Sequence, residues 1–154
     1  MQLSDLIAPE AVLCDVRANS KKQFLQTMAE HAARSVGVES RRIFETLSQR
    51  ERLGSTGIGN GVALPHGKLD GLDDLSVHFA RLAKPLAFEA MDDEPIDLAF
   101  VLLAPEGAGA EHLKALSRVA RIMREPQMLD RLRGAPNAAA IYDLLSQVRQ
   151  PAAA

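Results

Sequence analysis

One histidine stands in a setting that suits nucleophilic chemistry, in the tripeptide Pro65-His66-Gly67. The proline stiffens the backbone before the ring, and the glycine after it has no side chain to crowd the imidazole. An unperturbed histidine has a pKa of about 6.5, so most of the ring is neutral at pH 7 and can attack phosphorus. The tripeptide therefore indicates a histidine that accepts a phosphoryl group.

Glycines crowd the segment before this histidine, at Gly54, Gly57, Gly59 and Gly61. They allow backbone N–H groups to approach an anion such as phosphate, but they suit plain tight turns equally well. A Walker loop is excluded, because five residues separate Gly61 from Gly67 and because Leu69 follows Lys68. The dinucleotide pattern G-x-G-x-x-G is also missing, so we expect no nucleotide cofactor.

Phosphoryl transfer requires donors around the equatorial oxygens of the phosphate. Arg50 offers a planar guanidinium that is always charged, and it lies close in sequence to the glycine-rich segment. Further candidates for phosphate contact are Ser55, Thr56 and Gly67. Arg52 and Lys68 are explained at least as well as solvated surface residues.

Two segments carry a resemblance to a known family. QRERLGSTGIGNGVALPHGK, residues 49–68, closely resembles the active-site signature of phosphotransferase-system IIA domains of the fructose–mannitol–nitrogen family. EHLKALSRVARIM, residues 111–123, resembles the family's later helix with a second active-site histidine. By position, the resemblance implies that His66 is phosphorylated and that His112 and Arg50 assist it. It also implies a phosphoenolpyruvate-dependent relay in which an HPr-like carrier is the donor.

Within the family, the nitrogen-regulatory type fits best. Gly59-Asn60-Gly61 is similar to that type, whereas mannitol-type members have an acidic residue in place of Asn60. This likeness implies regulation of target proteins of the potassium-transport or sensor-kinase type, linked to nitrogen and potassium metabolism. Two alternatives stay open: a sugar-specific, fructose-type IIA component that passes phosphate to a IIB partner, and a binding regulator without catalysis.

A metal-dependent hydrolase would require His66, His78 and His112 to converge. The sequence has no H-E-x-x-H motif and no cysteine cluster, so we expect no metal site. His31 falls within a predicted helix and His78 within a predicted strand, and we expect both to be structural.

The elements that must position these residues follow from hydrophobic periodicity. Strands are predicted at 12–16, 62–64, 75–82 and 96–104, with the first at an edge and the last in the centre. Helices are predicted at 20–36, from Ser40 to near Arg52, at 110–124, 128–132 and from Asn137 through Val148. The helix at 110–124 is expected to bury Leu113, Leu116, Val119, Ala120 and Met123.

This pattern predicts an α/β fold, a single-domain three-layer α/β/α sandwich whose central mixed sheet has about five strands. Residues 1–150 are expected to form this phosphotransferase-system IIA domain, and residues 151–154 a disordered tail.

Composition narrows the classes of partner. With 18 basic and 20 acidic residues the formal net charge is −2, which does not favour nucleic acid as a partner. The single cysteine, Cys14, excludes an internal disulfide and fits the reducing cytoplasm. No segment approaches the roughly 18 apolar residues that span a membrane, so we expect no membrane insertion.

Overall fold

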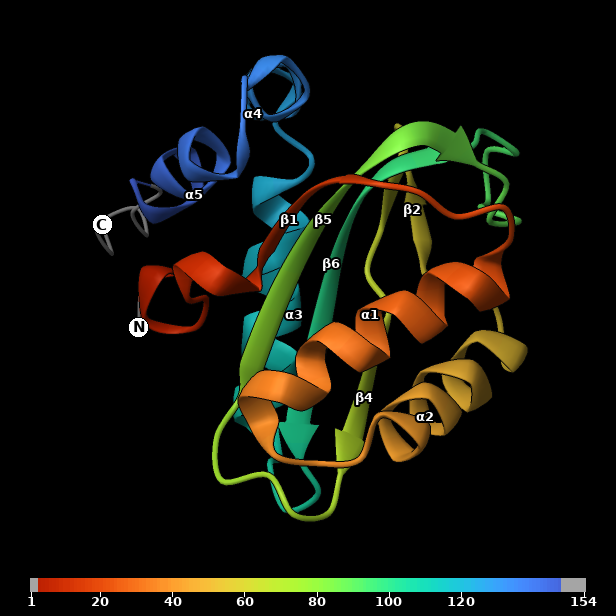
Figure 1. Ribbon diagram of the computed structural model, residues 1–154, viewed down its shortest axis with the longest axis vertical. Helices are drawn as coiled ribbons and strands as arrows, with labels where there is room; N and C mark the ends of the chain where they lie inside the picture. The colour runs from red at the N-terminus through yellow and green to blue at the C-terminus, as the bar shows by residue number, and fades with distance from the viewer. Residues whose placement is uncertain (1–2, 148–154) are drawn as a thin grey trace.

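The computed structural model describes residues 3–147, in which a six-stranded mixed sheet carries helices on both faces (Figure 1). The elements in chain order are η1 (Leu3–Asp5), η2 (Pro9–Ala11), β1 (Val12–Val16), α1 (Lys21–Val36), α2 (Ser40–Arg52), β2 (Gly57–Gly59), β3 (Val62–Ala63), β4 (His66–Leu69), β5 (Ser76–Leu86), β6 (Ile96–Pro105), α3 (Ala110–Ile122), α4 (Pro126–Gly134) and α5 (Ala138–Ser146).

The sheet is built around β6. Its main path runs β1-β5-β6-β3-β2, and β4 pairs with β6 beyond the end of β3. β6 is antiparallel to β5 and parallel to β3 and β4, while β1 is parallel to β5. The predicted central place of 96–104 and the predicted edge place of 12–16 are therefore confirmed. The sheet has six strands among the described residues, where about five were expected.

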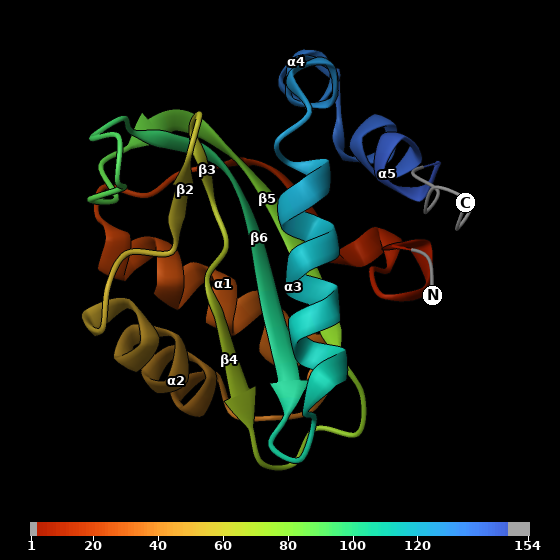
Figure 2. The same cartoon turned by 180° about the vertical axis from the view of Figure 1, so that it is seen from behind.

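Three layers follow from the alternation of side chains along β6. Leu98, Phe100 and Leu102 belong to one buried cluster, which also holds apolar residues of α3 and α5. Ala99, Val101 and Leu103 belong to the other, with apolar residues of α1 and α2. Because successive side chains of a strand point to opposite faces, each face of β6 buries its own helices. Figures 1 and 2 show α1 and α2 on one face and α3 on the other. The predicted three-layer fold is confirmed.

The ends of α1 and the start of α5 lie at the predicted bounds, and each carries a capping residue. The Ser20 hydroxyl accepts a hydrogen bond from Gln23 N at 3.1 Å, and Gly37 closes α1 in the left-handed conformation with φ of 72°. The Asn137 side chain caps α5 by accepting from Ala140 N at 2.9 Å. The predicted starts of these two helices are thus confirmed.

The glycine-rich segment is more regular than expected. β2 and β3 form a hairpin whose two turn residues, Asn60 and Gly61, have φ of 57° and 79°. An Asn-Gly turn with both φ angles positive has the twist that joins two antiparallel strands. His66 then opens β4, a strand that was not among those predicted from the sequence. The hairpin has its own signal in the sequence, the Asn-Gly pair.

The buried face of α3 is also displaced from the expected one. The helix ends at Ile122, short of Arg124, and Leu113 is 65% exposed. The residues it buries are His112, Ala115, Val119 and Ile122. The expectation for Leu113 is wrong because the inward position on that turn is taken by His112, which the hydrophobic pattern counts as polar.

Val148 and the predicted tail at 151–154 lie outside the described residues. No helix within 3–147 combines the length and apolar character that crossing a membrane requires.

Candidate functional site

The site forms where β4 runs along β6, and within residues 3–147 no strand pairs with the other side of β4. His66 is paired in register with Leu102, whose side chain belongs to the cluster under α3. The next pair, Gly67 and Leu103, faces α1 and α2. The His66 ring therefore lies on the α3 side of an exposed strand edge, where a side chain from α2 can reach round to it.

Gly67 allows α2 to come this close. A Cβ placed at Gly67 would overlap the Cγ2 methyl of Thr46, which lies on α2 one turn before Arg50. The need for glycine here is steric, since its φ lies outside the left-handed region. The tight contact brings the end of α2, and with it Arg50, beside His66.

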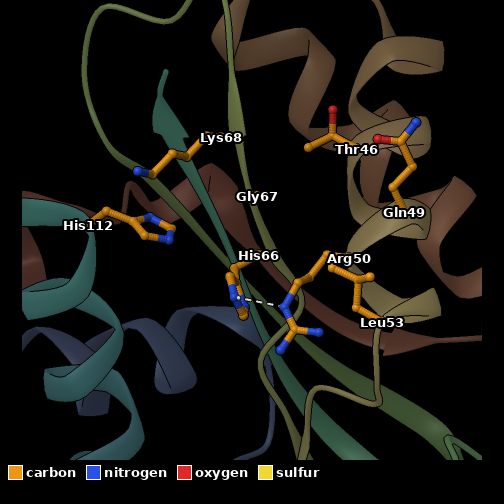
Figure 3. Close-up of a pocket in the computed structure, with 8 residues that line it drawn as sticks. All are labelled: Thr46, Gln49, Arg50, Leu53, His66, Gly67, Lys68 and His112. Carbon is orange, nitrogen blue, oxygen red and sulfur yellow. Dashed lines mark hydrogen bonds between the residues drawn. The ribbon is translucent and has the colours of Figure 1, made fainter. Parts of the chain in front are cut away.

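The His66 ring is held in one tautomer. Its Nδ1 lies 2.8 Å from the carbonyl oxygen of Leu64. A carbonyl can only accept, so Nδ1 carries the proton and Nε2 keeps its lone pair. Arg50 Nε donates a hydrogen bond to that Nε2 at 3.3 Å (Figure 3). The ring nitrogen with the lone pair thus points to a permanent cation.

Burial of the half-buried His66 lowers its pKa below the ordinary 6.5, and the positive charge of Arg50 lowers it further. The hydrogen bond to Leu64 and the negative charge of Glu51 act in the opposite direction. The ring is therefore neutral at pH 7, which is the form that can act as a nucleophile.

His112 approaches the His66 ring from the first turn of α3. Its side chain is buried, at 6% exposure, and its ring centroid lies 5.7 Å from that of His66. Burial lowers the pKa of His112, and the neighbouring His66 and Lys68 lower it further. Both rings are thus neutral together, which allows them to lie close without repulsion.

These groups line an open pocket of about 490 Å³. Figure 3 shows His112 on one side of the His66 ring and Arg50 on the other, with the Lys68 amine on the His112 side. The full lining is Thr46, Gln49, Arg50, Leu53, His66, Gly67, Lys68 and His112. Two fixed cations and two neutral imidazoles suit a small anion of high charge density, such as a phosphoryl group.

The structure thus brings together four of the residues singled out in the sequence: His66, His112, Arg50 and Gly67. Sequence reasoning passed over Thr46, Gln49 and Leu53 as lining residues. Counted from Thr46, the residues Gln49, Arg50 and Leu53 follow at three, four and seven positions, and this spacing along one face of α2 and its C-cap is the signal that could have found them.

Ser55 and Thr56 are not among the residues that line the pocket. The Ser55 hydroxyl donates to the carbonyl oxygen of Phe88 at 2.8 Å and accepts from Gly57 N at 3.1 Å. The Thr56 hydroxyl is bonded to the buried carboxylate of Glu51. Both hydroxyls hold the backbone in place, and their contact with phosphate stays a prediction.

The other two histidines meet on the opposite face of the sheet. His78 pairs with Val101 of β6 on the α1 side, and its ring centroid lies 6.5 Å from that of His31. Burial lowers the pKa of His78 to about 4. His78 therefore does not converge with His66 and His112. Within residues 3–147 no three His, Cys, Asp or Glu side chains are grouped to hold a metal ion.

The chain is similar to known proteins over nearly its whole length. The family described as "Phosphoenolpyruvate-dependent sugar phosphotransferase system, EIIA 2" matches residues 5–148. A nitrogen regulatory protein of Bradyrhizobium diazoefficiens is 53% identical over 146 residues, which cover 95% of each chain. A nitrogen regulatory protein of Klebsiella oxytoca is 40% identical over 149 residues, covering 96% of this chain and 91% of its own.

Among solved structures, the nitrogen regulatory protein IIA-Ntr from Neisseria meningitidis superimposes with a TM-score of 0.87 at 33% identity. The match covers 92% of this chain and 97% of that one. The resemblance read from residues 49–68 and 111–123 thus extends over nearly the whole chain and its fold.

Proposed function

The chain belongs to the EIIA 2 family of the phosphoenolpyruvate-dependent sugar phosphotransferase system, and on this premise we propose that it is a phosphocarrier whose acceptor is Nε2 of His66. The observation that carries the proposal is the tautomer of the ring, since Leu64 holds the proton on Nδ1 and leaves the Nε2 lone pair beside Arg50. Similarity to nitrogen regulatory proteins supports a regulatory output rather than a role in sugar uptake.

The reaction follows from this geometry. The Nε2 lone pair attacks the phosphorus of a phosphohistidine on an HPr-like carrier, and a new N–P bond forms at His66. The N–P bond of the donor breaks, and its electron pair returns to the donor's ring. The Nδ1 proton stays in its hydrogen bond with Leu64. Arg50 transfers its hydrogen bond from Nε2 to the phosphoryl oxygens, which are also approached by His112 and Lys68.

Phosphoryl labelling tests the proposal. Incubation with phosphoenolpyruvate, enzyme I and an HPr-type carrier should place an acid-labile, alkali-stable phosphate on the wild type and none on His66→Ala. His31→Gln is the matched control, because it removes another partly buried histidine that lies away from the pocket. Undiminished labelling of His66→Ala would exclude this histidine as the acceptor.

The output we propose is regulation of target proteins of the potassium-transport or sensor-kinase type in the cytoplasm. Phosphorylation adds nearly two negative charges to a pocket lined by the cations of Arg50 and Lys68, so it cancels most of the positive charge that a partner meets there. Pull-downs with phosphorylated and unphosphorylated protein should capture different partners. Equal capture by both forms would contradict phosphorylation-dependent regulation.

Two other functions remain distinguishable by experiment. The family's description names a sugar phosphotransferase system, so one alternative is that the chain passes its phosphate to a IIB partner, as a fructose-type component would. A chase of labelled protein with IIB domains would then move the label. If the chain is a binding regulator without catalysis, the wild-type protein takes up no label. Wild type and His66→Ala then capture the same partners.

A further inference from the structure

A buried carboxylate lies directly behind the site, on the residue after Arg50. Glu51 is 9% exposed at the end of α2, and its Oε2 forms an ion pair with Lys21 Nζ at 3.0 Å. Its Oε1 accepts from Thr56 N at 3.1 Å and also bonds the Thr56 hydroxyl. Burying a carboxylate is costly unless it is paired and hydrogen-bonded, and Glu51 has both kinds of partner. Through these partners it joins α1, the end of α2 and the segment at Thr56.

The hydrogen bonds continue from Thr56 to the acceptor histidine. The carbonyl oxygen of Thr56 accepts from Leu64 N at 2.9 Å, and the carbonyl oxygen of Leu64 accepts from His66 Nδ1 at 2.8 Å. Leu64 falls between β3, which ends at Ala63, and β4, which begins at His66. Its N–H is thus held by Thr56 rather than by the ladder to β6.

Lys21 completes the arrangement from α1. Its Nζ lies 4.5 Å from the centroid of the Phe88 ring, in addition to its ion pair with Glu51. A cation in the first turn of a helix opposes the helix dipole, so the dipole does not favour Lys21 there. The ion pair with Glu51 and the contact with the Phe88 ring stabilise Lys21 at this position. The charge of Lys21 also offsets that of the Glu51 carboxylate, which would otherwise repel the phosphoryl group arriving nearby.

We propose that Glu51, neutralised by Lys21, is a positioning residue for phosphoryl acceptance, which acts through Thr56 and the Leu64 carbonyl to hold His66 in the tautomer with Nε2 free. Glu51 touches neither donor nor phosphate. Arg50 and Glu51 then act on the same ring from adjacent positions of α2, one at Nε2 and the other through Nδ1. The role in acceptance rests on the proposed function, whereas the effect on the tautomer does not.

The tautomer can be measured without any phosphoryl donor. Long-range proton–nitrogen NMR at about pH 8, above the ordinary pKa of histidine, reports which ring nitrogen of His66 carries the proton. In wild type we expect the proton on Nδ1. In Glu51→Ala the ratio of the Nε2–H to the Nδ1–H form should rise about fivefold, which corresponds to the loss of one ordinary hydrogen bond. The initial rate of His66 labelling should fall with the fraction of rings that carry the proton on Nδ1, and therefore by less than this factor.

Three variants separate positioning from general stability. Lys21→Met should shift the tautomer ratio in the same direction by a smaller factor, and Lys21→Arg should restore it because the cation is kept. Glu45→Gln is the matched control, since it breaks an exposed ion pair with Arg41 on the same helix and should leave the ratio unchanged.

A folded Glu51→Ala protein with the wild-type tautomer ratio would overturn the proposal. If Glu51→Ala fails to fold, Lys21→Met and Thr56→Val decide: a wild-type ratio in both overturns it, and a shift in Lys21→Met supports it. Failure of the proposed function looks different, because wild-type protein would then take up no label while the tautomer still depended on Glu51.

Discussion

Replacing Gly67 by alanine tests how closely α2 must pack on β4. The added Cβ would overlap Thr46 Cγ2, so the helix must retreat by roughly 1 Å to restore ordinary contact. Overpacking of this kind costs about 1–3 kcal/mol of the free energy of unfolding. The retreat also carries Arg50 away from His66 Nε2, and a misplacement of about 1 Å at a reacting centre can slow transfer up to about 100-fold.

A second substitution, Thr46→Ala, should reverse the sign of the stability change that Gly67→Ala causes. In a Thr46→Ala background the methyl is gone, and the remaining contacts of the new Cβ, with Thr46 Cβ and carbonyl oxygen, are ordinary ones of 3.7 and 3.8 Å. Gly67→Ala should then stabilise the protein by about 0.4–1 kcal/mol, because alanine lowers the entropy of the unfolded chain. The coupling free energy between the two positions is thus at least about 1.4 kcal/mol.

The assay is urea unfolding of wild type, both single variants and the double variant, followed by far-UV circular dichroism. His66 labelling of the same four proteins should fall in Gly67→Ala and recover in the double variant. An equal cost of Gly67→Ala in both backgrounds would refute the argument from the Thr46 methyl.

The pKa values of His66 and His78 can each be tested by a substitution. Arg50→Met should raise the pKa of His66 toward its ordinary value, because the repulsion by Arg50 is lost while burial remains; an unchanged NMR titration would contradict this. His78 has a pKa of about 4 when folded against 6.5 when unfolded, so the unfolded chain binds the extra proton and stability falls as the pH drops through this window. His78 should contribute about 2 kcal/mol to the loss between about pH 7 and about pH 5 in urea unfolding, and His78→Leu should reduce the total loss by that amount. Equal slopes for wild type and His78→Leu would contradict the assignment.

Local signals in the sequence located most of the elements. Ser20, Gly37 and Asn137 mark helix ends because each supplies a capping group or a left-handed residue that the helix end requires. The long apolar run at 96–104 identified the central strand because only a strand covered on both faces can bury it all.

The signals failed where a tertiary contact outweighed the local pattern. β4 has only four residues, too short to show periodicity, and it is a strand because β6 lies beside it. In α3 the apolar pattern pointed to Leu113, but His112 takes the inward position and lines the pocket, because the way α3 packs on the sheet sets which face is buried.

The sequence by itself determined the chemistry of this protein. Pro65-His66-Gly67, Arg50 and His112 supply the imidazole that we propose as the acceptor, a cation and a second imidazole, and these properties belong to the side chains themselves. Only the tertiary structure decided that the three meet at the free edge of β4, with the proton of His66 on Nδ1 and Glu51 behind it. The reason is that strand order, register and helix packing join residues distant in the chain, and local sequence preferences carry no information about such contacts.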